Sequence, residues 1–303
     1  MTSFPAALSG RNKGKSAMDN RTSAWIYGFA GVAIFSGSLP ATRVAVADFD
    51  PVFLTLVRAA IAGLVGGACL LLLRQRRPAR GDMLSLLITT LGVVVGFPLL
   101  TAMALERITS AHSMVFIGLL PLATAIFAVL RAGDRPRPVF WLFSTLGAGL
   151  VAGFALTEEL SASWSGDLLM LAAILVCGLG YAEGAKLSRA LGGWQVISWA
   201  LVLALPVMLP LALLAQPETY AGIAPPAWIA LGYVSLFSML IGFVFWYRGL
   251  AQGGIAAVGQ LQLLQPFMGL MLAAGLLGEA VSPAMALVCL AVVACVAGAR
   301  RFA

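Results

Sequence analysis

LERITSAHSMVFIGLLP at residues 105–121 and LAQGGIAAVGQLQLLQP at residues 250–266 are two copies of one pattern, each running from a leucine to a proline. The copies are 145 positions apart, and the same offset places Gly133-Asp134 on Gly278-Glu279 and Pro138 on Pro283. Apolar residues align easily by chance, but matched prolines and a matched glycine–acid pair do not. The pattern therefore indicates an internal duplication.

The amino-acid composition of the whole chain indicates whether the protein folds in water or in a lipid bilayer. Hydrophobic residues make up 61% of the 303 residues and charged residues 10%, with a mean hydropathy of +0.97. A soluble domain is about half apolar and about a quarter charged. So few charges could not cover a surface in water, so the composition predicts an integral membrane protein with the lipid bilayer as its partner.

Apolar runs of the length that crosses a bilayer, about 17–25 residues, predict ten transmembrane helices. They cover residues 24–47, 51–73, 82–104, 110–131, 138–156, 166–189, 193–215, 227–249, 254–277 and 283–299. Residues 1–23 are predicted to be a cytoplasmic tail that is disordered over its polar part, residues 1–20.

The basic residues predict the orientation. Sixteen of the 19 lysines and arginines fall in the N-terminal tail and in alternate loops, on one side of the predicted spans. The positive-inside rule places this side, and both termini, in the cytoplasm of a bacterial-type inner membrane. The net charge of +7 thus reflects membrane topology rather than a nucleic-acid partner.

Five helices per copy is an odd number, so the two copies enter the membrane from opposite faces. We expect an all-α fold of two inverted five-helix repeats, residues 24–156 and 166–299, around a central cavity. Such repeats can exchange conformations and thereby open a shared site to either face.

The chain resembles the ten-helix branch of the drug/metabolite transporter superfamily, which carries two EamA domains. The resemblance covers nearly the whole chain after residue 24 and rests on Ser36-Gly37-Ser38 with Arg43, Pro51 with Arg58, Ala104 to Pro121, and Gly249 to Pro266 with Gly278-Glu279. Many members carry tryptophan where Ser36 precedes Gly37. The resemblance implies that helices five and ten are peripheral, and it suggests the aromatic amino-acid exporter type.

No catalytic pattern is present. The sequence contains no P-loop, Rossmann glycine pattern or GxSxG motif, and its four cysteines and single His112 have no metal-ligand spacing. We therefore predict a secondary transporter without cofactor or metal, not an enzyme. It would export amino acids or similar small metabolites by alternating access. A drug exporter or a nucleoside/purine exporter of the same fold is the alternative, and a passive channel would not need the repeat. The oligomeric state is open, and a monomer would suffice.

Polar and aromatic side chains inside the predicted spans are candidates for the cavity. The set is Ser36, Arg58, Tyr181, Trp199, Ser238, Gln260, Gln262 and Gln265. Arg58 could bind a substrate carboxylate, pair with an acid, or extend to the interface. Amides are costly in hydrocarbon, so the glutamines should face a cavity or another helix. Ring packing is the alternative for Tyr181 and Trp199.

Four further side chains have structural alternatives. Pro121 and Pro266 lie mid-helix and predict symmetric kinks or hinges. Glu183 either pairs with Lys186 three residues on, or takes part in proton coupling or substrate binding. His112 suits a proton relay or a hydrogen bond between helices.

Overall fold

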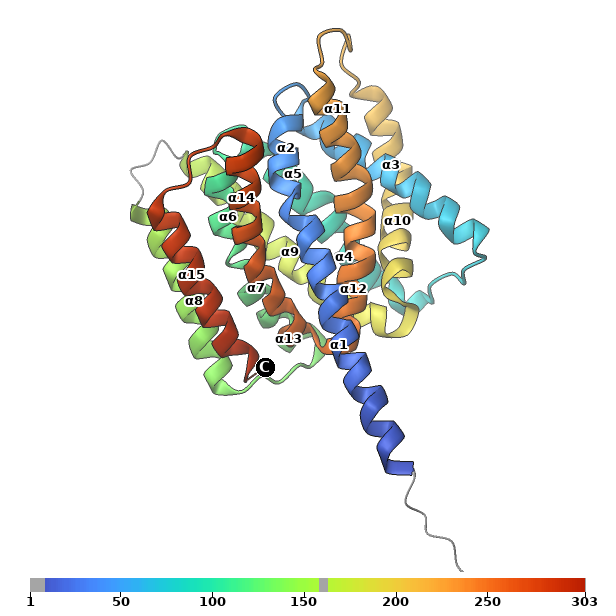
Figure 1. The fold of residues 1–303 in the computed structure, drawn as a ribbon. Coiled ribbons are helices and arrows are strands. Elements are labelled where there is room, and N and C mark those ends of the chain that lie inside the picture. Colours follow the sequence, from blue (N-terminus) through green and yellow to red (C-terminus); the bar gives the residue numbers. More distant parts are fainter. Residues whose placement is uncertain (1–8, 158–162, 303) are drawn as a thin grey trace, which may run out of the picture.

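The chain folds into helices that run side by side in one bundle (Figure 1). This computed structural model describes residues 9–157 and 163–302, and every regular element within these ranges is helical. The first half contains α1 (Ser9–Ser36), α2 (Ser38–Ala45), α3 (Pro51–Leu72), η1 (Arg80–Asp82), α4 (Met83–Thr89), η2 (Thr90–Gly96), α5 (Phe97–Leu105), α6 (Ser110–Ile117), α7 (Leu120–Phe127), η3 (Ala128–Ala132) and α8 (Pro138–Thr157). The second half contains α9 (Trp164–Leu191), α10 (Gly193–Leu214), α11 (Pro225–Gly232), η4 (Tyr233–Ile241), α12 (Gly242–Gly253), α13 (Ile255–Gly259), η5 (Gln260–Leu264), α14 (Gln265–Leu277) and α15 (Pro283–Arg300).

Seven helical segments among the described residues are long and apolar enough to cross a membrane. They are Thr22–Ala45, Pro51–Leu72, Arg80–Leu105, Trp164–Leu191, Gly193–Leu214, Pro225–Gly253 and Ile255–Leu277. Shorter apolar helices at Leu120–Ala132, Pro138–Leu150 and Ala286–Ala299 overlap the three other predicted spans. The prediction of an all-helical membrane protein is confirmed. The fourth predicted span is shorter because its helix is interrupted at Gly118-Leu119.

The disorder predicted for residues 1–20 is wrong from Ser9 onward. Residues 1–8 lie outside the described residues, but α1 already begins at Ser9 and continues into the apolar span that begins at Thr22. Once a helix has formed, each further residue adds one hydrogen bond at little cost. No proline lies between Pro5 and Pro40 to stop that extension.

The packing of the helices has the symmetry expected of inverted repeats. The first span (α1) packs on the eighth (α12), and correspondingly the sixth (α9) packs on the third (α4, η2 and α5). Further pairs join equivalent spans: α3 packs on α10, α6 and α7 pack on α14 and α13, and α8 packs on α15. Figure 1 shows α8 and α15 side by side at one edge of the bundle, the peripheral place that the resemblance implied.

Local irregularities of the helices recur at the same offset. The π-helical segments η2 and η4 end at Gly96 and Ile241, 145 positions apart, and α7 and α14 begin at Leu120 and Gln265, again 145 apart. Pro121 follows the break at Gly118-Leu119, whereas Pro266 follows the 3₁₀ segment η5 within one continuous helical run. Each lies in the first turn of a new segment, where the missing N–H leaves no hydrogen bond unmade.

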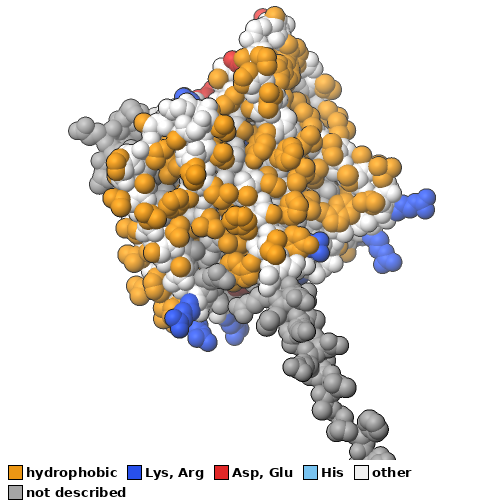
Figure 2. Space-filling model, viewed as in Figure 1, with side chains coloured by type: hydrophobic (Ala, Val, Ile, Leu, Met, Phe, Trp, Pro, Cys, Tyr) orange, Lys and Arg blue, Asp and Glu red, His pale blue; other side chains and the backbone are white. Residues whose placement is uncertain are grey.

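Charges separate to the two ends of the bundle, and hydrophobic side chains cover the wall between them (Figure 2). We call one end the basic face, defined by Arg74, Arg76, Arg77, Arg135, Arg137, Lys186 and Arg189, and the other the acidic face, defined by Asp48, Asp50, Glu106, Glu218 and Glu279. The C-terminus and the protruding start of α1 lie at the basic face (Figure 1). Exposed leucines such as Leu71, Leu72 and Leu214 lie on the wall, as a lipid-facing surface requires.

Candidate functional site

A cavity lies between the two halves, closer to the acidic face. Its walls come from α1, α2, α3, η2, α5 and α7 of the first half and α9, η4, α12 and α14 of the second. It contains about 480 Å³ of empty space, distributed between the side chains rather than collected in one chamber. The side chains must therefore separate to admit a molecule as large as an amino acid.

Arg58 supplies the charge of this cavity. Asp50 caps α3 by accepting hydrogen bonds from the N–H groups of Val52 and Phe53, both at 2.9 Å, and Arg58 follows two turns later. The Arg58 side chain is 5% exposed, and its Nη2 donates to the Val234 carbonyl (3.1 Å) and to Ser238 Oγ (3.3 Å). The side chain therefore points into the bundle rather than out to the interface.

The charge of Arg58 is not balanced locally. None of the lining residues, all of which belong to the described ranges, is acidic. Arg58 Nε is buried and has no hydrogen-bond partner among the described residues. A buried cation without a counter-charge is costly, so the cavity favours a ligand that carries a negative group.

A buried acceptor lines another wall of the cavity. Gln265, in the first turn of α14, donates from Nε2 to the Phe35 carbonyl (3.3 Å), while its Oε1 is buried and lacks a partner within the described part of the chain. Ser38 and Ser238 complete the polar lining with a hydroxyl–hydroxyl bond of 2.7 Å between α2 and η4. The cavity thus offers one free donor on a cation and one free neutral acceptor.

Aromatic rings cover the side of the cavity towards the basic face. Phe35 packs edge-on against Phe243 (ring centroids 4.9 Å apart) and is stacked with Tyr181 (6.4 Å), and Tyr181 contacts Trp246 (5.7 Å). Phe97 also lines the cavity. These rings form an apolar floor between the polar lining and the basic face.

The cavity gathers only part of the set predicted from sequence. Arg58, Tyr181, Ser238 and Gln265 line it. Ser36 instead bonds the Val32 carbonyl of its own helix (2.8 Å), and Trp199 is half-buried and packs against the core. Ser38, Phe35, Phe97 and Phe243 line the cavity without having been in the set. Phenylalanine carries no sequence signal that separates a cavity wall from ordinary packing.

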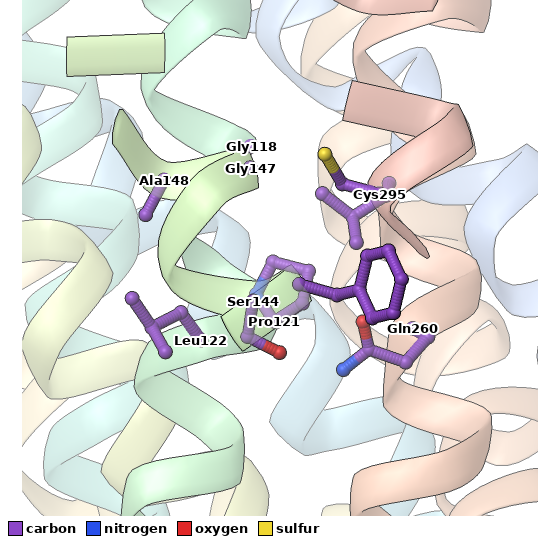
Figure 3. A pocket seen from close by; sticks show the side chains of 10 residues that line it. Gly118, Pro121, Leu122, Ser144, Gly147, Ala148, Gln260 and Cys295 are labelled. Atoms are coloured by element: carbon purple, nitrogen blue, oxygen red, sulfur yellow. The ribbon is translucent and has the colours of Figure 1, made fainter. Parts of the chain in front are cut away.

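Gln260 lies in a different pocket. This second pocket contains about 240 Å³ of empty space between α7, α8, η5 and α15, and Figure 3 shows Gln260 there with Ser144, Pro121 and Cys295. Gln260 donates to the Ala256 carbonyl of its own helix at 3.4 Å. It therefore lies outside the central cavity, although it is only five residues from Gln265.

Gln262 is fully buried and lies beside the Tyr181 side chain, but neither amide atom makes a hydrogen bond of normal geometry among the residues that the structure describes. A buried amide without partners costs about 1–3 kcal/mol. We therefore expect Gln262→Met, which keeps the size and removes the polar atoms, to raise the thermal midpoint of the detergent-solubilised protein by about 2–4 °C per kcal/mol recovered. A fluorescence melt measures this. Gln265→Met, which loses the bond to Phe35, is the matched control and should show no such gain; a lowered midpoint for Gln262→Met contradicts the expectation.

The predicted pairing of Glu183 with Lys186 is wrong. Glu183 forms its ion pair with Arg131 of η3, and Lys186 is exposed on the outer side of α9. The buried face of α9 turns Glu183 towards the first half, where Arg131 reaches in from the basic face. Glu183 Oε2 is buried and without a partner in the described part of the chain.

His112 forms the hydrogen bond between helices that was one of its two alternatives. Its Nε2 lies 2.9 Å from Asp167 Oδ1, so the bond joins α6 of the first half to α9 of the second at the acidic face. No cluster of three or more His, Cys, Asp or Glu side chains that could hold a metal ion occurs among the described residues.

Comparison with known proteins identifies the family of the chain. The EamA-like transporter family matches residues 22–156 and again residues 164–300, which together cover both halves of the bundle. The chain belongs to the EamA-like transporter family. It is therefore a multi-pass membrane transporter of the drug/metabolite superfamily and not an enzyme, as predicted from the sequence.

Relatives of this EamA-like transporter carry the same general description. It is 67% identical over 286 residues to the uncharacterized transporter YdeK of Bacillus subtilis, covering 94% of this chain and all of the relative (100%). It is 24% identical over 257 residues to the uncharacterized inner membrane transporter YedA of Escherichia coli K12, covering 84% of this chain and 83% of the relative. A solved crystal structure with 20% identity superposes with a TM-score of 0.73 over 93% of this chain and 100% of that chain, which shows the shared fold.

Proposed function

We propose that this EamA-like transporter exports amino acids, aromatic ones foremost, or similar zwitterionic metabolites by alternating access. One observation carries the proposal: the central cavity combines an unbalanced cation, Arg58, with a free acceptor, Gln265 Oε1, above an aromatic floor. A zwitterion carries a carboxylate for the first and an ammonium group for the second. An aromatic side chain would pack on Phe35, Tyr181 and Phe243.

The proposed direction follows from the faces. The basic face is assigned to the cytoplasm by the positive-inside rule, which places both termini there. The aromatic floor then lies between the cavity and the cytoplasm, and the polar lining lies towards the outside. The halves proposed to rock against each other are residues 24–156 and 166–299.

Efflux from proteoliposomes tests the proposal. Liposomes loaded with labelled phenylalanine or leucine should release it faster than protein-free liposomes, with saturation at high concentration. Competition by tryptophan but not by a nucleoside or a cationic dye separates an amino-acid exporter from a drug or nucleoside exporter. Equal release with and without protein for both labels would sink the proposal, and unitary currents in a planar bilayer would show a channel instead.

A further inference from the structure

Asp48, Glu279 and Asp134 each accept a hydrogen bond from the backbone of the half to which they do not belong, and the last two lie at opposite ends of the bundle. Glu279, just after α14, accepts from Ser110 Oγ (2.8 Å) and from the N–H groups of Ser110 (3.4 Å) and Ala111 (2.9 Å). Asp134, just after η3, accepts from the N–H of Ala256 (3.2 Å). Each acid therefore caps the first turn of a central helix in the opposite half.

The two contacts are copies of each other. Asp134 and Glu279 are 145 positions apart, and so are the two alanines whose N–H groups they accept, Ala111 and Ala256. The offset that relates the sequences thus also relates a pair of contacts between the halves. One contact lies at the acidic face and its copy at the basic face.

The backbone that presents each acid is duplicated too. Gly133 and Gly278 are left-handed (φ 74° and 63°), and each ends its helix. The following N–H, of Asp134 or Glu279, bonds the carbonyl six positions back, at Ala128 or Ala273, at 3.3 Å in both copies. This helix-ending turn favours glycine and holds the acid at a defined place.

The ion pairs between the halves lie at the same two faces. At the basic face Arg189 of α9 lies 3.4 Å from Asp134, and Arg131 pairs with Glu183. At the acidic face His112 bonds Asp167. Both ends of the interface between halves are therefore held by charged groups, while the cavity lies between them.

We propose that Asp134 and Glu279 are positioning residues for transport, a symmetric pair of latches in which Glu279 holds the acidic face shut and Asp134 holds the basic face shut. Rocking of one half against the other releases one latch as it tightens the other. The inference rests on the proposed alternating exposure of the cavity, not on the identity of the substrate.

Symmetry favours latches over permanent clamps. In an inverted repeat the two end states exchange the conformations of the halves. A contact that is made in one end state and broken in the other therefore has a copy that is broken in the first state and made in the second. The contacts are already unequal here: Glu279 accepts three hydrogen bonds from the opposite half, and Asp134 accepts one from the backbone together with Arg189. If both contacts were permanent, weakening one or the other would not shift the exposure of the cavity towards opposite faces.

Labelling of a cysteine in the cavity tests this without any substrate. Thr101, which lines the cavity, is replaced by cysteine in a chain whose native cysteines are replaced by alanine. A membrane-impermeant maleimide is then applied from each side, to right-side-out and inside-out vesicles. Glu279→Gln should raise the ratio of acidic-face to basic-face labelling about 10-fold, because charge-assisted hydrogen bonds that close the acidic face are weakened. Asp134→Asn should lower the ratio by a similar factor, and the double variant should return it towards the starting value.

The matched control is Asp50→Asn, which removes a capping carboxylate at the acidic face whose hydrogen bonds within the described residues come from N–H groups of its own half. It should leave the ratio unchanged. If an amide variant fails to give monodisperse protein, Glu279→Asp and Asp134→Glu, which keep the charge and change the reach, should give opposite shifts of smaller size. Shifts in the same direction, or shifts no larger than that of Asp50→Asn, would overturn the latches.

The outcomes separate this inference from the proposed function. Opposite shifts in a protein that does not move amino acids uphold the latches and overturn the proposed substrate. Amino-acid efflux with shifts in one direction upholds the substrate and overturns the latches. A reporter cysteine that is reached from one face only in every variant overturns alternating exposure and both proposals with it.

Discussion

Replacement of Arg58 by methionine is expected to lower kcat/KM for amino-acid efflux on the order of 100-fold while the protein still folds. The reason is the charge of the cavity. Arg58 is 5% exposed, and no acidic side chain is among the lining residues of the described chain, so the substrate carboxylate is the partner that the guanidinium lacks. Removal of the cation would leave that carboxylate buried without a counter-charge, which costs about 2–5 kcal/mol.

The same substitution should not harm stability, and this distinguishes a binding role from a structural one. A buried charge without a partner opposes folding, so methionine of similar length should leave the thermal midpoint unchanged or raise it. Ser238, which loses the hydrogen bond from Arg58, keeps its bond to Ser38. Efflux in proteoliposomes and a detergent melt on the same preparation measure the two effects.

Two controls sharpen the result. Arg107→Met removes an exposed arginine near the acidic face that donates to the Met103 carbonyl of its own chain segment, and it should transport as the parent does. Arg58→Lys keeps the charge but lacks the planar guanidinium. Its kcat/KM should lie between those of the parent and Arg58→Met, about 10-fold below the parent. Parent-like efflux in Arg58→Met would contradict a carboxylate site at Arg58, whatever the substrate proves to be.

The sequence predicted the architecture well because composition, the lengths of apolar runs and the internal repeat can all be read directly from the order of residues. The 145-residue offset at Pro121 and Pro266 anticipated paired irregularities that the structure also shows in η2 and η4. Composition predicted a membrane protein, and the lengths of the apolar runs predicted that its spans are helices. The start of α1 at Ser9 was missed because a polar segment can extend a helix that an apolar span has already nucleated.

The site was predicted less completely because a helical period does not say what a side chain meets across the bundle. Gln260, Gln262 and Gln265 lie within six residues, yet only Gln265 reaches the central cavity, because η5 and the start of α14 turn the three in different directions. Glu183 was assigned the nearest cation along its own helix, whereas Arg131 comes from the other half. The first case depends on a change from 3₁₀- to α-helix and the second on a contact between the halves, and local sequence spacing encodes neither.

The second large effect is expected at Gly92, where the third span crosses the sixth. A Cβ added at Gly92 would lie 2.5 Å from the Val176 carbonyl oxygen and 3.0 Å from the Gly180 Cα, so the two helices meet backbone to backbone. Glycine permits this approach, as small residues do where membrane helices pack closely. The neighbouring atoms are main-chain atoms and cannot rotate away, so an added methyl group must push α9 and η2 apart.

Gly92→Ala should therefore destabilise the protein by about 3 kcal/mol, the upper end of the cost of overpacking. This corresponds to a fall of the thermal midpoint on the order of 6–12 °C. Gly149→Ala is the matched control, since a Cβ there meets nothing within 4 Å among the described residues and Gly149 is exposed on α8. Alanine favours a helix over glycine by up to about 1 kcal/mol, so the control should be neutral or stabilised. The same substitution thus has opposite signs at two helical glycines, and the sign at Gly92 depends on the contact between the two halves. Equal midpoints for the two variants would contradict a backbone-to-backbone crossing at Gly92.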